Sequence, residues 1–355
     1  MGRHSGFGNL FPAIHSLHDG RIEEISVPSQ SNKRTVLGHL FGRPRHMEPP
    51  KPPSQPVSPF TEPRHELVAM EALSLALRHT DAVILLSVGE SQFCGPLAHG
   101  RANVKSRMAL FLHQPPSWLE QHWRDWSLMD GIGAIICLGP KQQKFMQSKV
   151  RGPVYCIRHG VDSAFFTPPR ARRRLFGDPK VLFVGQWLRD FETLHGAYQN
   201  LRKMIPRISM DCVIPKTALS DQYLSAMVHD ESVRWHCDLS DRQLRTLYRE
   251  ATVLFLPLCD AVANNALLEA LATGLPIVTT DVGDVSFYLR GAGARLCQPR
   301  NTHEHATMVQ MLCHGRTTDS ESVVFARSPD VQHLEWNSIA QNTLDILGSL
   351  RRSVS

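Results

Sequence analysis

The chain has 355 residues, 42% of them hydrophobic, which is enough for two domains with a ligand cleft between them. Its 39 Lys and Arg exceed its 33 Asp and Glu by too little to predict a nucleic-acid-binding protein. The eight cysteines include no C-x-x-C pair, which argues against a zinc site and favours reduced thiols. The longest apolar run, AVILLSV, is far shorter than the roughly 20 residues of a membrane span.

The start of the chain carries two unusual segments. GRHSGFGNL has the glycine spacing of a loop between a first strand and a first helix, yet Met1 leaves no room for that strand. We therefore expect a sheet without its first strand, or a natural chain that begins further upstream. Nine prolines between positions 28 and 63 predict a mobile surface insertion. The start also lacks a signal peptide, so a cytoplasmic protein is expected.

Basic residues cluster at 31–46 and 168–176. A solvated loop is the simpler interpretation of each run. Either run would also suit peripheral contact with an anionic membrane at the cytoplasmic face.

From about residue 80, short β-rich runs alternate with helix-length amphipathic segments. This alternation predicts an α/β protein with two parallel sheets, because most of the runs are apolar throughout. We place a domain boundary near 160, inside HGVDSAFFTPPRARRRLFGDPK, giving domains 1–160 and 161–330 and a terminal helix in 331–355. The ten predicted strands are 82–88, 108–113, 134–139, 154–160, 180–186, 209–215, 233–237, 252–258, 276–282 and 294–299.

A helix follows the apolar run TVLFLPL, in the stretch NNALLEALATG. Asn264 is its predicted cap, and Gly274 followed by Pro276 ends it. The helix N-terminus collects about half a positive charge and free N–H groups, which suit a phosphate. Asn265 and Glu269 lie on a face away from the leucines, so Glu269 is either solvated or a partner of two ribose hydroxyls. The spacing alone favours the solvated position.

Four stretches in order resemble one family: YCIRHGVDSAFFTP, VLFVGQWLRDFETL, LSDRQLRTLYREATVLFLPL and ANNALLEALATGLPIVTTDVG. They are similar to the retaining glycosyltransferases of the GT-B fold, family 4, also called group 1. The resemblance is strongest from Val154 to Cys297. It implies two Rossmann-like domains facing across a cleft: an N-terminal domain on the acceptor side and a C-terminal domain that binds the nucleotide sugar. It also implies that the terminal helix crosses back to the N-terminal domain.

The resemblance implies a hexosyltransferase-type enzyme that moves a sugar from a nucleoside-diphosphate sugar to an acceptor hydroxyl with retention of configuration. A UDP-, GDP- or ADP-linked donor, a glycan or lipid-linked acceptor and a role in cell-surface glycan or polysaccharide synthesis are the expected context. No metal or other cofactor is expected, and the sequence contains no D-x-D. No nucleic-acid partner is expected.

The resemblance also assigns roles to residues. Backbone N–H groups at the helix start hold the diphosphate and Glu269 holds the ribose, while His113 and Arg189 act at the donor sugar and the leaving diphosphate. The alternatives are that His113 caps a loop before Pro115 and that Arg189 pairs with Asp190 or Glu192 on a surface turn. The implied catalytic residues are His113, Arg189 and Glu269; the implied donor-binding residues are Gly6, Gly8, Gly185, Asn264, Asn265, Ala266, Leu267 and Glu269.

Two departures from the family pattern keep other functions open. Ala261 stands where the family has a second glutamate, and no lysine follows Gly185. A non-catalytic nucleotide-sugar-binding subunit is one alternative. A GT-B nucleotide-sugar epimerase is another, which the transferase-like helix segment makes the weaker of the two.

Overall fold

The computed structural model describes residues 7–17, 63–79, 81–93, 95–169, 178–314 and 329–352. Gly6, nearly all of the proline-rich segment and most of both basic runs lie outside the described residues. Contacts divide the chain into two compact units. The first unit falls within Met1–His18, Leu138–Gln142 and Ile157–Asn342, and the second within Asp19–Cys137, Gln143–Cys156 and Thr343–Ser355.

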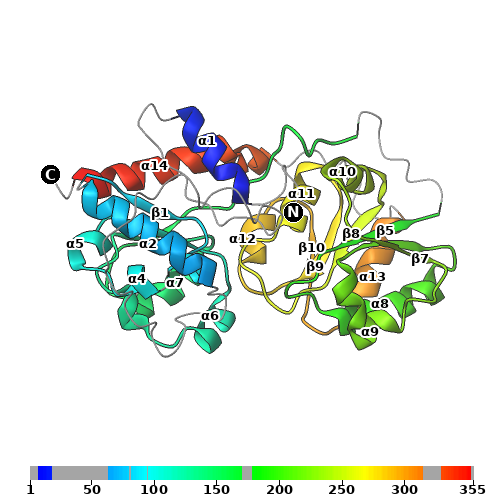
Figure 1. Ribbon diagram of the computed structural model, residues 1–355. Helices are drawn as coiled ribbons and strands as arrows, with labels where there is room; N and C mark the ends of the chain where they lie inside the picture. Colours follow the sequence, from blue (N-terminus) through cyan, green and yellow to red (C-terminus); the bar gives the residue numbers. More distant parts are fainter. Residues whose placement is uncertain are drawn as a thin grey trace, which may run out of the picture. The chain divides into compact units, whose positions relative to one another are not determined.

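The second unit is built on a four-stranded parallel sheet in the order β1-β2-β3-β4, with helices around it (Figure 1). Every residue of β2 is buried, as expected for an apolar strand covered on both faces. The strands are β1 (Ile84–Leu86), β2 (Met108–Leu112), β3 (Ala134–Cys137) and β4 (Val154–Cys156). The helices are α2 (Pro63–Arg78), α3 (Gly89–Gln92), α4 (Gly95–Ala98), α5 (Ala102–Lys105), α6 (Pro116–His122) and α7 (Pro140–Lys149).

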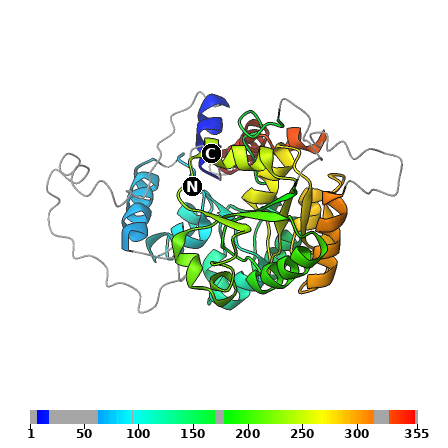
Figure 2. The same ribbon diagram turned by 90° about the vertical axis from the view of Figure 1, so that its right-hand side faces the viewer.

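The first unit holds a six-stranded parallel sheet in the order β10-β9-β8-β5-β6-β7. Figures 1 and 2 show α8 beside α13 on one face, and Figure 1 shows α10 and α11 on the other. The strands are β5 (Lys180–Val184), β6 (Ser209–Val213), β7 (Val233–His236), β8 (Val253–Leu256), β9 (Ile277–Thr280) and β10 (Arg295–Cys297). The main helices are α8 (Phe191–Met204), α9 (Gln222–Ser225), α10 (Asp241–Glu250), α11 (Asn265–Ala272), α12 (Val285–Leu289) and α13 (Thr302–Cys313).

All ten predicted strands are present, and the predicted α/β class with two parallel sheets is confirmed. Several helices begin at side chains that accept hydrogen bonds from their first-turn N–H groups. Asp190 caps α8, Asn301 caps α13, and Ser240 with Gln243 forms a capping box on α10.

The ends of the chain contribute helices. Within the described residues no strand precedes β1; the 3₁₀ turn η1 (Phe7–Asn9) leads directly into α1 (Leu10–Leu17). The terminal helix α14 (Trp336–Arg352) follows a 3₁₀ turn, and the ring of Trp336 packs against Phe7 and His159.

Candidate functional site

In the six-stranded sheet, the order in which the strands follow one another reverses between β5 and β8. From β5 the chain continues to β6 and β7 on one side, and from β8 it continues to β9 and β10 on the other. In open parallel sheets the segments that leave the strand ends diverge at such a point, and ligands bind there. Here two backbone hydrogen bonds connect the segment after β5 to the segment after β8. The Asp190 N–H donates to Pro257 O at 3.1 Å, and the Cys259 N–H donates to Leu188 O at 3.0 Å.

Arg189 lies in the segment after β5 and its guanidinium folds back toward the strand. Nε donates to Val184 O at 2.9 Å and Nη1 to Trp187 O at 2.8 Å. Gly185 makes this possible, since it has a φ of +85° and a Cβ on it would lie 2.8 Å from Arg189 Nη2. The alternative pairing of Arg189 with Asp190 is wrong, because the Asp190 carboxylate caps α8 through both the backbone and the hydroxyl of Thr193.

The start of α11 lies at the end of the segment after β8. The predicted cap is confirmed: Asn264 Oδ1 accepts hydrogen bonds from Ala266 N at 3.1 Å and Leu267 N at 3.4 Å. Arg189 Nη2 also donates to this oxygen, at 3.4 Å. Three donors, one of them cationic, therefore converge on one oxygen at a helix N-terminus. An oxygen of a diphosphate would meet the same three donors if the Asn264 side chain moved aside.

Glu269 lies one turn further along α11, and its solvated alternative is wrong. Glu269 is 3% exposed, within a run from Ala266 to Ala272 that is buried throughout. It interacts with the hydroxyl of Tyr248, whose pKa is raised well above its usual value by burial and by the Glu269 charge. Burial lowers the pKa of Arg189 to about 10, and interactions with Tyr248 and Glu269 oppose that shift. The guanidinium therefore stays charged at neutral pH, and the half-buried Arg189 forms a polar cluster with the buried Tyr248 and Glu269 side chains.

Tyr248 belongs to this cluster although sequence reasoning missed it. It lies on α10 with no exposed surface, and its ring packs edge-on against Phe166. The signal was present in LSDRQLRTLYREA, where Leu244, Leu247 and Tyr248 follow the helical period of a core face. A hydroxyl on such a face needs a polar partner. Glu269 provides it.

The second unit places His113 directly after β2, half-buried. Its Nε2 lies 2.7 Å from Ser87 O, in the segment after β1, so the ring is held by that segment. Gly8 belongs to the first unit, where it lies exposed in η1 with no atom within 4 Å of a Cβ built on it. Gly6 lies outside the described residues.

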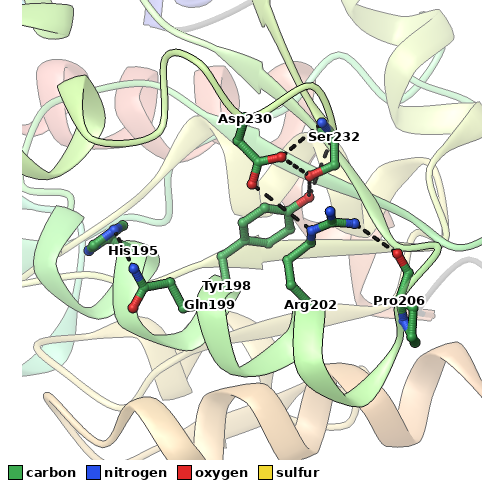
Figure 3. Close-up of polar contacts among 7 residues, drawn as sticks. All are labelled: His195, Tyr198, Gln199, Arg202, Pro206, Asp230 and Ser232. Atoms are coloured by element: carbon green, nitrogen blue, oxygen red, sulfur yellow. Dashed lines mark hydrogen bonds and ion pairs between the residues drawn. The ribbon is translucent and has the colours of Figure 1, made fainter.

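A groove of about 550 Å³ runs along α8 in the first unit, and none of the predicted site residues lines it. Figure 3 shows that its polar groups bond to one another. Tyr198 and Ser232 share a hydrogen bond of 2.9 Å, Ser232 Oγ donates to Asp230 at 2.5 Å, and Arg202 donates to Pro206 O at 2.8 Å. This network braces the end of α8 against the segment before β7.

The described residues include neither a cluster of metal-ligating side chains nor a helix suited to span a membrane. No group of three or more His, Cys, Asp and Glu side chains is placed to hold a metal ion. Nor does any helix within those residues combine the length and the apolar character that crossing a bilayer requires.

Comparisons with known proteins bear on the segment that holds this cluster. A family model described as glycosyl transferases group 1 matches residues 178–314. A glycogen synthase of Mycobacterium tuberculosis (strain CDC 1551 / Oshkosh) is 23% identical over 237 residues, covering 64% of this chain and 56% of the relative. A D-inositol 3-phosphate glycosyltransferase of Arthrobacter sp. (strain FB24) is 28% identical over 206 residues, covering 53% and 48%. The chain spans about half the length of these curated relatives.

Solved structures share the fold. A UDP-forming α,α-trehalose-phosphate synthase from Burkholderia vietnamiensis superposes with a TM-score of 0.61 at 13% identity, covering 82% of this chain and 78% of that one. An Anabaena protein, HepE, in complex with UDP and glucose gives a TM-score of 0.60 at 15% identity, covering 81% and 83%. The predicted group 1 resemblance and the predicted GT-B architecture are both confirmed.

Proposed function

Because a family model of glycosyl transferases group 1 matches residues 178–314, we propose that the protein transfers a sugar from a nucleoside-diphosphate sugar to an acceptor hydroxyl, with retention of configuration. The observation that carries the proposal is the convergence of Ala266 N–H, Leu267 N–H and Arg189 Nη2 on one oxygen position. That position lies where the strand order reverses between β5 and β8. The buried carboxylate of Glu269 follows one turn later on the same helix.

Each group has a distinct task in this proposal. The α11 N-terminus and Arg189 stabilise the charge that grows on the leaving diphosphate, which is the largest electrostatic demand of the reaction. Glu269, held by Tyr248, accepts hydrogen bonds from the ribose hydroxyls. The Asn264 side chain moves aside when the donor binds, and an oxygen of the diphosphate takes the position of its amide oxygen. His113 acts on the donor sugar. We also propose that the transfer needs no metal, since helix and arginine supply the positive charge.

The substrates are proposed by class. UDP-, GDP- and ADP-sugars fit a site that reads a diphosphate and a ribose. Relatives named for glycogen synthesis and for inositol 3-phosphate suggest an α-glucan or a phosphorylated polyol as acceptor. Cell-surface glycan or polysaccharide synthesis is the setting that we propose.

A matrix of donors and acceptors tests this function. UDP-, GDP- and ADP-glucose would each be incubated with an α-glucan, inositol 3-phosphate and simple sugar phosphates, with and without EDTA. Proton NMR would read the anomeric configuration of any product. We expect one donor to be used with retention and without loss of rate in EDTA. An inverted product would contradict the proposed stereochemistry, and activity restored only by magnesium or manganese would contradict metal independence.

A nucleotide-sugar-binding subunit remains the second candidate because of position 261. Ala261 is 4% exposed, and its carbonyl accepts the Asp284 N–H at 2.9 Å, so this position offers no carboxylate to a donor sugar. Donor binding with no turnover across the whole acceptor matrix would favour this alternative.

A further inference from the structure

Glu90 is a buried carboxylate that the proposed function does not yet use. It is 1% exposed and lies on α3, just after β1. Its Oε1 accepts hydrogen bonds from the backbone N–H groups of His113 and Gln114, the latter at 2.7 Å, just after β2. Its Oε2 is buried and, among the described residues, has no hydrogen-bond partner. The two strands are parallel neighbours, so both segments leave the same edge of the sheet.

A glycine brings Glu90 to this position. A Cβ on Gly89 would lie 2.8 Å from Phe111 O and 3.1 Å from the Leu112 side chain, so α3 packs directly on β2. This approach places the Glu90 carboxylate at the N–H groups of the two residues that follow the strand.

The ring of His113 is held by the same segment. Nε2 lies 2.7 Å from Ser87 O, and a carbonyl oxygen only accepts hydrogen bonds. Nε2 therefore carries the proton, and the neutral ring has its lone pair on Nδ1. The segment after β1 thus fixes His113 twice: Glu90 holds its backbone, and Ser87 O holds its ring and sets the tautomer.

We propose that Glu90 is a positioning residue for His113, and that its reach rather than its charge keeps the ring in the Nε2-protonated tautomer. The role rests on the proposed function, in which His113 acts on the donor sugar. The role uses Oε1 alone, since that one oxygen accepts hydrogen bonds from both N–H groups, and Oε2 takes no part in it. An accepting imidazole nitrogen matches the hydrogen-bond donors that sugar hydroxyls offer.

Variants of Glu90 distinguish the effect of side-chain length from the effect of its negative charge. E90Q keeps the length and one acceptor oxygen, whereas E90D keeps the charge but is one methylene shorter. Side-chain ¹⁵N NMR would report the His113 tautomer, assigned by comparison with H113Q. E120Q serves as the matched control, because Glu120 is an exposed glutamate of the same unit. UDP calorimetry and turnover of the best donor complete the set.

We expect E90Q and E120Q to keep the Nε2-protonated tautomer and turnover within about threefold of the native protein. In E90D and E90A the tautomers mix, and kcat falls about 10- to 100-fold, the usual effect of a small misplacement. UDP affinity stays constant throughout, since its ligands lie in the first unit. If E90A does not fold, the E90Q and E90D pair still decides the question.

Two results would overturn the positioning role: a native tautomer in E90D, or an E90Q as impaired as E90D. Absence of UDP, GDP and ADP binding by the native protein is a separate outcome, since it would refute the proposed function and leave the tautomer measurement intact.

Discussion

Asn264 occupies with its own amide oxygen the position that we assign to the diphosphate, so stability and affinity should respond oppositely to its replacement. N264A frees three donors for the ligand but loses a cap that contributes about 1 kcal/mol to stability. N264D keeps the cap but places a negative charge against the diphosphate. We expect UDP affinity in the order N264A, native, N264D, with N264D weaker than native by about tenfold.

Urea unfolding and calorimetry on the same samples check this order. N301D is the matched control, because Asn301 caps α13 in the same unit and should leave UDP affinity unchanged. If affinity falls in parallel with stability across the Asn264 variants, the diphosphate does not bind at this oxygen position.

Glu269 should matter both to the ligand and to the fold. E269A removes an acceptor of ribose hydroxyls and should weaken nucleotide binding by about 1 to 3 kcal/mol. Its burial beside Tyr248 adds a loss of stability of about 1 to 3 kcal/mol, because the Tyr248 hydroxyl is left buried without its polar partner. If Glu269 were solvated, as the spacing alone favours, E269A would leave the stability of the fold unchanged. E250A, at an exposed glutamate on α10, is the control, and unchanged affinity in a folded E269A would remove Glu269 from the site.

At the level of single residues, the sequence predicts local features better than distant partners. The Asn264 cap follows from an asparagine before a helical period, so it could be predicted. The burial of Glu269 could not, because Tyr248 comes from α10 and Arg189 from the turn after β5. Glu90 carries no local motif, and its partners come from the next strand.

Among the elements, α13 is coupled through His305 to β9, and through β9 to the segment after β8. Its Nδ1 donates to Asn301 O at 2.8 Å, so Nε2 is the acceptor that faces Thr280 Oγ1 at 3.2 Å. Thr280 Oγ1 in turn accepts the Leu258 N–H at 2.9 Å. Burial lowers the pKa of His305, while Asn301, Glu304 and Asp190 partly oppose the shift. If the ring were protonated, the His305 Nε2–H and the Thr280 hydroxyl would both be donors, and the hydrogen bond between them would be lost.

The pH dependence of stability follows from that direction. A histidine with a lowered folded pKa binds protons more readily in the unfolded chain, so its stabilisation is complete above about pH 6.5 and is lost as the pH falls below it. The slope from one such group is at most about 1.4 kcal/mol per pH unit. We expect H305Q to flatten the urea-unfolding profile between pH 5 and 7 while H303Q, at an exposed neighbour on the same helix, leaves it unchanged. An unchanged slope in H305Q would contradict the neutral, buried His305.

At the level of elements, the ten strands could be predicted because most of them are apolar runs between turn residues. Their order could not, since periodicity does not say which strands pair. The position of the site depends on that order: β5 and β8 are far apart in sequence, and only their pairing brings Arg189 to Asn264.

For the whole molecule, two α/β units with parallel sheets and a group 1 match over residues 178–314 indicate the GT-B architecture. The order of the four similar stretches made this architecture predictable. Substrate identity was not predictable in the same way, because loops and side chains at the strand ends set it, and folds of this class host many activities.

Calorimetric titration of the full-length protein with UDP, GDP and ADP tests the central claim most directly, with the corresponding nucleosides as controls for the diphosphate. We predict that one nucleoside diphosphate binds with one-to-one stoichiometry, that its nucleoside binds far more weakly, and that both E269A and N264D reduce the affinity. Failure of all three diphosphates to bind the folded protein would contradict the account, and so would binding that neither substitution changes.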